Sequence, residues 1–395
     1  MSDTLFIGKH ENELRIALYE NDRIAELYID RKNESGIMGN VYRGKVQSYL
    51  PGMQAAFIDI GTDKNAYLYT GENSTVVKRT LFGEQTAGSL KPGDKITVQV
   101  LKETPGNKGP RVTTNITFAG MYVICIPGSQ GAYVSKKITD AEEKDRLNRL
   151  AYQLKPEGFG LIIRTEAEDV EEELIRNDLD FIMQKIKGIV KKEAEGSVPA
   201  LIYDGADAVE FAVRELLKQS TEKVITDDPD VYRTVEELLS WVSPDMKALL
   251  KYAGVEESAF WHDKIDACLV KIGARKVWLK CGGYVVIDKT EALTAIDVNT
   301  GKNVGNKQLR DTIMETNLQA ATEIARQLRL RDIGGIIIID FIDMKQDKDK
   351  RALLDALRKV LREDKMRTVV VGITKLNLVE MTRKRRRPDM NSLEK

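Results

Sequence analysis

The sequence contains few of the residues that support several common kinds of protein site. Among its 395 residues there are three cysteines, Cys125, Cys268 and Cys281, and no two of them form a Cys-x-x-Cys pair. This excludes a disulfide framework, and we expect a reducing, cytoplasmic environment. There are two histidines, His10 and His262. Their number argues against catalysis by several histidines, so an enzyme of this composition must use carboxylates, a hard metal ion, lysine or arginine.

Long hydrophobic runs are also missing. The longest aliphatic stretch is the four isoleucines at 336–339, whereas a membrane span needs about 18–20 apolar residues. The opening stretch MSDTLFIGKHENE has no basic segment followed by an apolar core, so we expect no secretory signal. Hydrophobic residues make up 42% and charged residues 31% of the chain. These proportions fit a soluble globular protein, and the length predicts two to four domains of roughly 100–200 residues each.

The net charge of zero hides an uneven distribution. Residues 280–395 carry 24 basic and 17 acidic side chains, a net charge of +7 that the rest of the chain balances. A basic segment favours an anionic partner. Part of this excess lies in the run Arg383–Arg387, which is equally well explained as a solvated surface tail.

The first 118 residues have the pattern of two groups of strands. Three short strands are predicted within residues 4–30, too few to be stable alone. Five further strand-like runs follow in residues 36–118, separated by turns rich in glycine and proline: VYRGKVQSYL, QAAFIDIG, NAYLYTGE, KITVQVLKE and RVTTNITF. Five short strands in about 80 residues predict a small closed barrel, of which the OB-fold is the commonest kind.

The remaining residues mix helices with strands. Residues 119–200 predict an α+β arrangement, with an amphipathic helix at 141–154 that buries Leu147, Leu150, Ala151 and Leu154. From residue 200 a strand, helix, strand and helix alternate, beginning with the strand ALIYD. The N-terminal strands are expected to complete this sheet, which makes residues 36–200 an insertion.

The last region is predicted to contain a hairpin, a long helix over 307–331, and a strand of four consecutive isoleucines. We expect the helix to bury Leu309, Ile313, Ala320, Ile324 and Leu328. A strand of four aliphatic residues in a row is typical of one covered on both faces.

Two strands of this region end in acidic residues. In ALTAIDVNT the strand leads to Asp297, with Asn299 two residues on and therefore on the same face. In GGIIIIDFIDM the strand ends at Asp340, with Asp343 three residues on. Ligands bind at the carboxyl ends of strands in open α/β sheets, so Asp297 and Asp340 are expected to converge, and paired carboxylates suit Mg²⁺. The alternative is that each acid caps a helix or joins a buried ion pair.

These stretches resemble one family closely. EALTAIDVNTGKN, METNLQAATEIARQLRLRDIGGIIIIDFIDM and LNLVEMTRKR are similar to the catalytic domain of the ribonuclease E/G family. GNVYRGKVQSYLPGMQAAFIDIG resembles its OB-fold RNA-binding domain, and GPRVTTNITFAGMYVICIPG with PEGFGLIIRT resembles its sensor of the RNA 5′ end. The likeness covers nearly the whole chain in the same order.

The resemblance implies a multidomain protein of α/β and α+β parts. Residues 1–35 and 201–278 would form a split, structural RNase H-like domain, interrupted by an OB-fold β-barrel domain at 36–118 and a 5′-end sensor domain at 119–200. Residues 279–395 would form a DNase I-like catalytic domain.

The same resemblance implies the activity. A member of this family is expected to be a Mg²⁺-dependent endoribonuclease that cleaves single-stranded, AU-rich RNA with a preference for 5′-monophosphorylated ends, in rRNA and tRNA processing and mRNA decay. Asp297 and Asp340 match the family's metal ligands, and Asn299 matches the residue that helps to position the scissile phosphate. A non-catalytic RNA-binding protein and a phosphohydrolase of small nucleotides are the competing hypotheses.

Further residues are assigned to RNA binding by the resemblance. Phe57, Tyr67 and Lys108 match the family's RNA-contacting aromatic residues and lysine. From the sequence alone Phe57, set between an alanine and an isoleucine, is slightly better explained as barrel core.

The pocket for the RNA 5′-monophosphate rests on the resemblance still more heavily. It would comprise Gly120, Ile124, Arg164 and Thr165. Without the resemblance, an arginine and a threonine at a strand end indicate no more than a surface position.

One feature of the family is absent from this sequence. The family usually continues past the VEMTRKR stretch to a Cys-Pro-x-Cys segment, through which two protomers share one Zn²⁺. This chain contains no such segment, so either the sequence is a shortened one or this member dispenses with the link, and homo-oligomer formation is left open. A short member without a long tail is more similar to the ribonuclease G side of the family.

Overall fold

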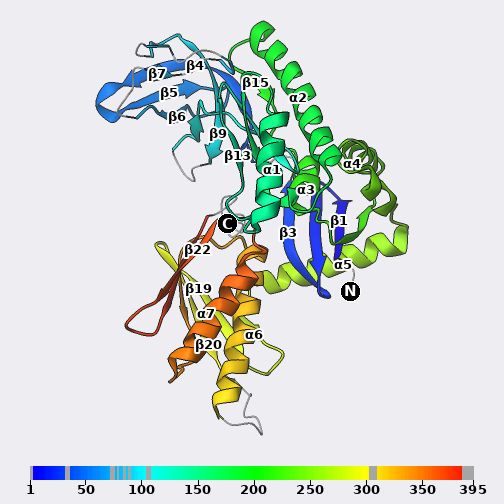
Figure 1. Cartoon of the computed structure of the whole chain (residues 1–395), viewed down its shortest axis with the longest axis vertical. Helices are drawn as coiled ribbons and strands as arrows, with labels where there is room; N and C mark the ends of the chain where they lie inside the picture. Colours follow the sequence, from blue (N-terminus) through cyan, green and yellow to red (C-terminus); the bar gives the residue numbers. More distant parts are fainter. Residues whose placement is uncertain are drawn as a thin grey trace. The chain divides into compact units, whose positions relative to one another are not determined.

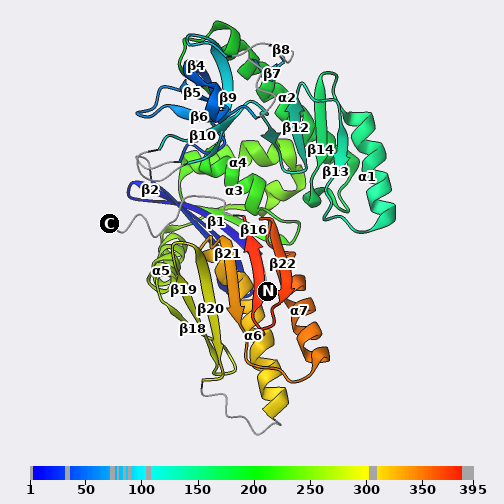
Figure 2. The same ribbon diagram turned by 90° about the vertical axis from the view of Figure 1, so that its left-hand side faces the viewer.

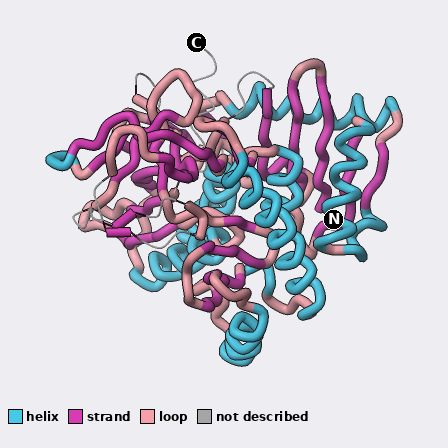
Figure 3. Tube along the Cα trace, turned by 90° about the horizontal axis from the view of Figure 1, so that it is seen from above, coloured by secondary structure: helices cyan, strands magenta, loops and turns pink. Residues whose placement is uncertain are grey.

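The computed structural model describes residues 3–31, 36–71, 76–77, 80–82, 86–87, 90–103, 108–301 and 309–384 (Figure 1). These residues divide into two compact units, each containing helices and strands (Figure 3). Unit 1 comprises residues 3–6, 15–29, 253–301 and 309–384, and unit 2 comprises residues 7–14 and the described residues between 30 and 252. Within the described part of the chain, none of the helices combines the length and the apolar character that crossing a bilayer requires.

The three N-terminal strands form where the sequence predicts them. They belong to a five-stranded sheet in the order β17-β16-β1-β2-β3, whose members are β1 (Asp3–His10), β2 (Glu13–Glu20), β3 (Arg23–Arg31), β16 (Thr221–Thr226) and β17 (Leu250–Tyr252). Asn21 and Asp22 both have positive φ, 49° and 63°, which is the backbone of a tight hairpin turn. The expected completion of the later α/β sheet by the N-terminal strands is confirmed.

A buried cation joins two of these strands to the rest of unit 1. Arg329, from helix α6 (Leu309–Leu330), donates to Glu26 on β3 at 3.0 Å and to Glu20 on β2 at 3.0 Å. All three side chains are less than a tenth exposed. Because buried charges are stable only when paired, this contact fixes the strands against α6.

The predicted barrel is present in unit 2. Five strands form a closed circuit because β9 pairs with both β10 and β4. The strands are β4 (Val41–Leu50), β5 (Ala55–Asp59), β6 (Ala66–Tyr69), β9 (Lys95–Lys102) and β10 (Arg111–Thr113). Alternate residues such as Ala56, Ile58 and Ile60 fill the interior, as the period of two requires. A short pair, β7 (Val76–Val77) and β8 (Thr86–Ala87), and a 3₁₀ turn, η1 (Pro51–Met53), complete this segment.

One strand does not lie where the sequence pattern placed it. The strand ALIYD was expected to open the α/β sheet, but β15 (Ala200–Tyr203) pairs antiparallel with β4 of the barrel. The prediction was wrong because the local pattern of a strand does not specify its partner. β5 pairs with residues 45–50 of β4, and β15 pairs with residues 41–43, near the start of that strand.

The segment after the barrel forms a four-stranded sheet with two long helices. The sheet has the order β11-β12-β14-β13 and comprises β11 (Phe118–Ala119), β12 (Val123–Pro127), β13 (Ala132–Val134) and β14 (Phe159–Ile163). Helix α1 (Ala141–Leu154) begins at its cap Asp140, whose carboxylate accepts a hydrogen bond from the Glu143 amide. Its four predicted apolar residues are buried, which confirms that helix and its inner face.

The second long helix of this segment and two further helices follow in unit 2, together with short 3₁₀ turns. They are α2 (Glu172–Glu195), α3 (Ala208–Leu216) and α4 (Pro229–Val242), with η2 (Thr165–Ala167) and η3 (Pro244–Leu249). Helices α3 and α4 begin at aspartate caps, Asp207 and Asp228. Helix α4 packs against both α2 and α3.

Unit 1 is built on a six-stranded sheet in the order β18-β19-β20-β21-β23-β22. Its strands are β18 (Lys276–Trp278), β19 (Tyr284–Lys289), β20 (Leu293–Asn299), β21 (Gly335–Asp340), β22 (Thr368–Ile373) and β23 (Val379–Arg383). Helices α6 and α7 (Asp347–Leu361) lie along one face of this sheet (Figure 2), and their apolar residues share one core with every second strand residue. Unit 1 also contains α5 (Val255–Ile272).

Two expectations about unit 1 were wrong. The isoleucine strand is covered on one face only, since Ile337 and Ile339 are fully buried whereas Ile336 is 51% exposed. Leu309 is 74% exposed, because the buried stripe of α6 starts at Thr312, one turn into the helix. A run of apolar residues identifies a strand, and helical spacing identifies a helix. Neither pattern shows how much of that strand or helix other segments will cover. The four domain limits expected from the sequence stay a prediction.

Candidate functional site

The two acids predicted to converge lie side by side in unit 1. Strands β20 and β21 are parallel neighbours, and their register sets Asp297 directly opposite Asp340. The flanking residues Ile296 and Ile339 belong to the core under α6 and α7. Because strand side chains alternate, both carboxylates project from the opposite, open face of the sheet.

Two amide side chains organise the surroundings of this pair. Asn299 donates its Nδ2–H to Asp297 Oδ2 at 2.6 Å, so the predicted catalytic amide is in direct contact with the predicted ligand. Asn317, buried on α6, exchanges hydrogen bonds with the backbone of Ile342 at 2.9 and 3.0 Å. That contact fixes the turn immediately after Asp340.

The electrostatics of the pair favour a bound cation. Partial burial, and then the negative charges of Asp297 and Asp343, raise the pKa of the Asp340 carboxyl. Asp343 lies near Asn377, whose Nδ2 is 3.5 Å from Asp343 Oδ1. No three acidic, histidine or cysteine side chains of the described residues are grouped as ready ligands for a metal. A pair of carboxylates still fits Mg²⁺, which keeps several waters and needs one or two protein carboxylates.

Two of the predicted RNA-binding residues form a pair on the outside of the barrel in unit 2. Phe57 on β5 pairs with Tyr67 on β6, and their ring centroids are 6.0 Å apart at 71°. Phe57 is half-buried, whereas Ala56 and Ile58 on either side of it are fully buried in the barrel core. The alternative that Phe57 fills the core is therefore wrong.

The loop that carries Lys108 reaches the same edge of the barrel. The carbonyl of Pro110, two residues after Lys108, accepts a hydrogen bond from the Tyr67 amide at 2.8 Å. Lys108 itself is exposed. An exposed lysine in a loop that is hydrogen-bonded to the strand of Tyr67 is suited to contact a phosphate of a strand whose bases stack on the barrel.

In residues 119–200, predicted from the resemblance to sense the RNA 5′ end and also in unit 2, the structure brings Arg164 to Gly120. Arg164 Nη1 donates to the Gly120 carbonyl at 2.5 Å, and its backbone amide donates to the Tyr122 carbonyl at 2.8 Å. Thr165 Oγ1 lies 2.8 Å from Ser135 Oγ. Ile124 pairs with Ile162, two residues before Arg164 on the neighbouring strand. The four predicted residues thus belong to one end of the sheet β11-β12-β14-β13.

The guanidinium of Arg164 already has a carboxylate partner. Its Nη1 and Nη2 atoms lie 3.1 and 2.8 Å from the two carboxylate oxygens of Glu215 on α3. Burial acts to lower the pKa of Arg164, but Glu215 and other nearby carboxylates outweigh it and the net shift is upward. A phosphate bound here must therefore share Arg164 with Glu215 or replace it.

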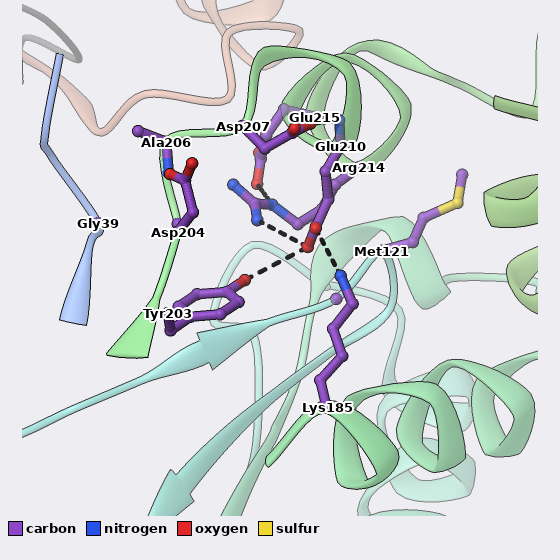
Figure 4. Close-up of polar contacts among 12 residues, drawn as sticks. Gly39, Met121, Lys185, Tyr203, Asp204, Ala206, Asp207, Glu210, Arg214 and Glu215 are labelled. Atoms are coloured by element: carbon purple, nitrogen blue, oxygen red, sulfur yellow. Dashed lines mark hydrogen bonds and ion pairs between the residues drawn. The ribbon is translucent and has the colours of Figure 1, made fainter. Parts of the chain in front are cut away.

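Glu215 belongs to a wider ionic network between α3 and its neighbours (Figure 4). Arg214 donates to Glu215 at 3.0 Å and lies 3.9 Å from Glu210. Glu210 also pairs with Lys185 on α2 and accepts a hydrogen bond from the Tyr203 hydroxyl at 3.3 Å. The network couples the position of Glu215, and through it Arg164, to α2 and β15.

A second buried acid shapes the turn between β11 and β12. Asp178 on α2 is fully buried and accepts hydrogen bonds from the backbone amides of Met121, Tyr122 and Val123 at 2.8–3.1 Å. Burial nevertheless raises the pKa of Asp178. A Cβ atom on Gly120 would lie 2.4 Å from both Asp178 oxygens, so this turn requires glycine.

Sequence reasoning missed three residues that position the predicted ones: Asp178, Glu215 and Asn317. A detectable signal existed for two of them, since Asp178 and Asn317 are polar residues on the apolar faces of otherwise amphipathic helices. Glu215 could not be recognised in this way, because a glutamate near the end of a helix with other charged residues is common and does not indicate a special role.

Comparison with known proteins gives one consistent result. Residues 117–386 match the model described as "Ribonuclease E/G family". The chain is 35% identical over 394 residues to a protein named ribonuclease G from Salmonella typhimurium, covering 98% of this chain and 81% of the relative. It is 37% identical to a ribonuclease G from Haemophilus influenzae, with 98% and 80% covered, and 37% identical to a ribonuclease E from Synechocystis, with 95% and 56% covered.

The tight packing at Gly120 predicts the effect of one added methyl group. Gly120→Ala should lower the free energy of unfolding by about 1–3 kcal/mol, because the added methyl group clashes with the Asp178 carboxylate, which three backbone amides hold in place. Gly188→Ala, in an open position of helix α2, is the matched control and should raise stability by about 0.5–1 kcal/mol. Urea denaturation of both variants makes the comparison, and equal stability of the two would contradict the assigned role of Asp178.

Proposed function

This chain belongs to the ribonuclease E/G family and is an endoribonuclease, and we propose that it hydrolyses single-stranded RNA at the Asp297–Asp340 pair with the help of Mg²⁺. The observation that carries the proposal is the register of β20 and β21, which places two carboxylates on the open face of one sheet. The proposed substrates are AU-rich single strands met during rRNA and tRNA processing and mRNA decay.

In this mechanism Asp297 and Asp340 hold the metal ion. Mg²⁺, when bound, polarises a phosphodiester and lowers the pKa of an attacking water. Asn299, whose amide already donates to Asp297, orients that carboxylate and presents its remaining polar atoms to the scissile phosphate. Asn317 holds the turn after Asp340 in place. Hydrolysis leaves a 5′-phosphate on one product.

We assign two further contacts to the RNA chain. Phe57 and Tyr67 would stack bases and Lys108 would meet a phosphate, as the half-buried rings on the outside of the barrel and the exposed lysine support. Gly120, Ile124, Arg164 and Thr165 would receive a 5′-monophosphate. Arginine is suited to this role because its planar fork binds phosphate through two parallel hydrogen bonds. The overall test is cleavage of a 5′-monophosphorylated single-stranded RNA with Mg²⁺, and its arrest by EDTA.

Neutralising the carboxylates tests the metal site. Asp297→Asn or Asp340→Asn should reduce the cleavage rate by orders of magnitude, because Mg²⁺ affinity falls when a charged ligand becomes neutral. RNA affinity and thermal melting should change little. Asp355→Asn, at an exposed position on α7, is the control and should cleave normally. Near wild-type rates in both site variants would remove Asp297 and Asp340 from the mechanism.

The sensor is tested by the ratio of cleavage rates for monophosphorylated and hydroxyl-ended RNA. Arg164→Ala should reduce that ratio on the order of tenfold or more, since a charge-assisted hydrogen bond contributes roughly 1.5–3 kcal/mol. Glu215→Gln should preserve or increase the ratio, because the phosphate then competes with a neutral side chain for Arg164.

The Arg164→Ala and Glu215→Gln variants also distinguish a role of Arg164 in binding the RNA 5′ end from a purely structural role. Arg164→Ala leaves the Glu215 carboxylate buried without the guanidinium, so thermal melting must accompany the rate measurements. If both variants lose stability while the ratio of rates stays unchanged, Arg164 is a structural ion-pair residue and the 5′ end binds elsewhere.

Salt dependence distinguishes the two kinds of barrel contact. Lys108→Ala should weaken binding of single-stranded RNA and flatten the salt dependence by about 0.7 on a log–log plot, the value for one phosphate contact. Phe57→Ala should lower affinity by the loss of stacking, roughly 1–3 kcal/mol, and leave the salt slope nearly unchanged. RNA titrations at several salt concentrations measure both quantities. A changed slope for Phe57→Ala would indicate a general disturbance of the barrel surface.

A further inference from the structure

Beside the carboxylate pair, the open face of the unit 1 sheet carries two aromatic side chains in line with Asn299. Trp278 on β18 pairs with Tyr284 on β19, and Tyr284 pairs with Asn299 on β20. Neighbouring strands are about 4.8 Å apart. Tyr284 is thus one strand, and Trp278 two strands, from the amide that contacts Asp297.

The burial pattern places these rings on the same face as the carboxylates. Val285 and Val298, which follow Tyr284 and precede Asn299, are in the core under α6, and Val277 packs against that core. Trp278 is 54% exposed. A large aromatic ring left half in water next to a polar site is more informative than an isolated exposed aliphatic residue.

A lysine completes the cluster. The Trp278 and Tyr284 ring centroids are 5.3 Å apart at 64°, and Lys276 Nζ lies 4.1 Å from the first and 3.5 Å from the second. In the part of the chain that the structure describes, no carboxylate pairs with Lys276. The cluster therefore combines a positive charge that is available to an anion with two ring surfaces.

The edge strand β18 also borders a hollow of about 580 Å³ in unit 1. Five lysine or arginine side chains line it against two acids, Asp22 and Glu323. Glu323 is already paired with Arg23 and Arg326. The lining thus has a positive balance, which favours an anionic ligand.

We propose that Lys276, Trp278 and Tyr284 form a nucleotide subsite for the single-stranded RNA substrate, on the β18 side of the carboxylate pair. A base would stack on the exposed ring of Trp278 with Tyr284 beside it, and the adjoining phosphate would meet Lys276 at the rim of the basic hollow. The subsite rests on the proposed function, since it is defined by its position next to Asp297 and Asp340. Stacking of this kind tolerates any base, so the subsite would position the strand without selecting its sequence.

Binding and cleavage of a short single-stranded oligoribonucleotide test the subsite in the full chain. With EDTA present, fluorescence anisotropy should show on the order of tenfold weaker binding for Trp278→Ala and for Tyr284→Ala. Trp278→Phe should retain most of the affinity. With Mg²⁺ present, Trp278→Ala should raise KM by a similar factor and leave kcat within about twofold. Trp241→Ala, 46% exposed on α4 in unit 2, is the control and should alter neither quantity.

The remaining outcomes are distinguishable. Unchanged RNA affinity of Trp278→Ala overturns the subsite. If that variant instead changes its oligomeric state in analytical ultracentrifugation, the Trp278 ring belongs to a protein interface. If Asp297→Asn and Asp340→Asn cleave normally, the proposed catalytic site fails, whereas the binding measured in EDTA stands independently. Loss of affinity in Trp278→Phe equal to that in Trp278→Ala also contradicts stacking.

Discussion

The parallel pairing of β20 with β21 is the constraint on which the candidate site depends, because it sets two like charges side by side at one end of a sheet. Such an arrangement costs free energy unless a cation or hydrogen bonds compensate it. Asn299 does part of this by donating a hydrogen bond to Asp297, whereas Asn317 only holds the turn after Asp340 in place. Partial burial, and then the charges of Asp297 and Asp343, raise the pKa of Asp340, so a cation bound beside the pair would stabilise its ionised form.

The segment that contains Gly120 and Arg164 is organised by the opposite arrangement, in which largely buried carboxylates already have hydrogen-bond partners. Asp178 accepts three backbone amides, and Glu215 accepts two hydrogen bonds from Arg164. Satisfied buried charges hold backbone and side chains in one geometry, and removing one partner is costly. Any anion that uses Arg164 therefore meets a preorganised guanidinium, but has to compete with Glu215 for it.

The two units share one way of presenting aromatic rings. Phe57 with Tyr67 on the barrel, and Trp278 with Tyr284 on the six-stranded sheet, are cross-strand pairs on outer sheet faces. Cross-strand neighbours hold their rings at a fixed spacing at little cost in conformational entropy. The sequence indicated the first pair through the family resemblance, whereas the second becomes visible only when the register of β18, β19 and β20 is known.

The sequence by itself determined the identity of most elements, because their patterns are local. Strand-like runs separated by turns rich in glycine and proline identified the barrel strands, and helical spacing identified residues 141–154 together with their buried face. It also identified Asp297 and Asp340 as acids at strand ends. Only the tertiary structure decided what depends on partners distant in the chain: that β15 joins the barrel, that Ile336 faces solvent, and that Glu215 holds Arg164. The physical reason is that strand pairing, register and burial are set by contacts between segments. The residue pattern within one segment does not specify which other segment will cover its surface.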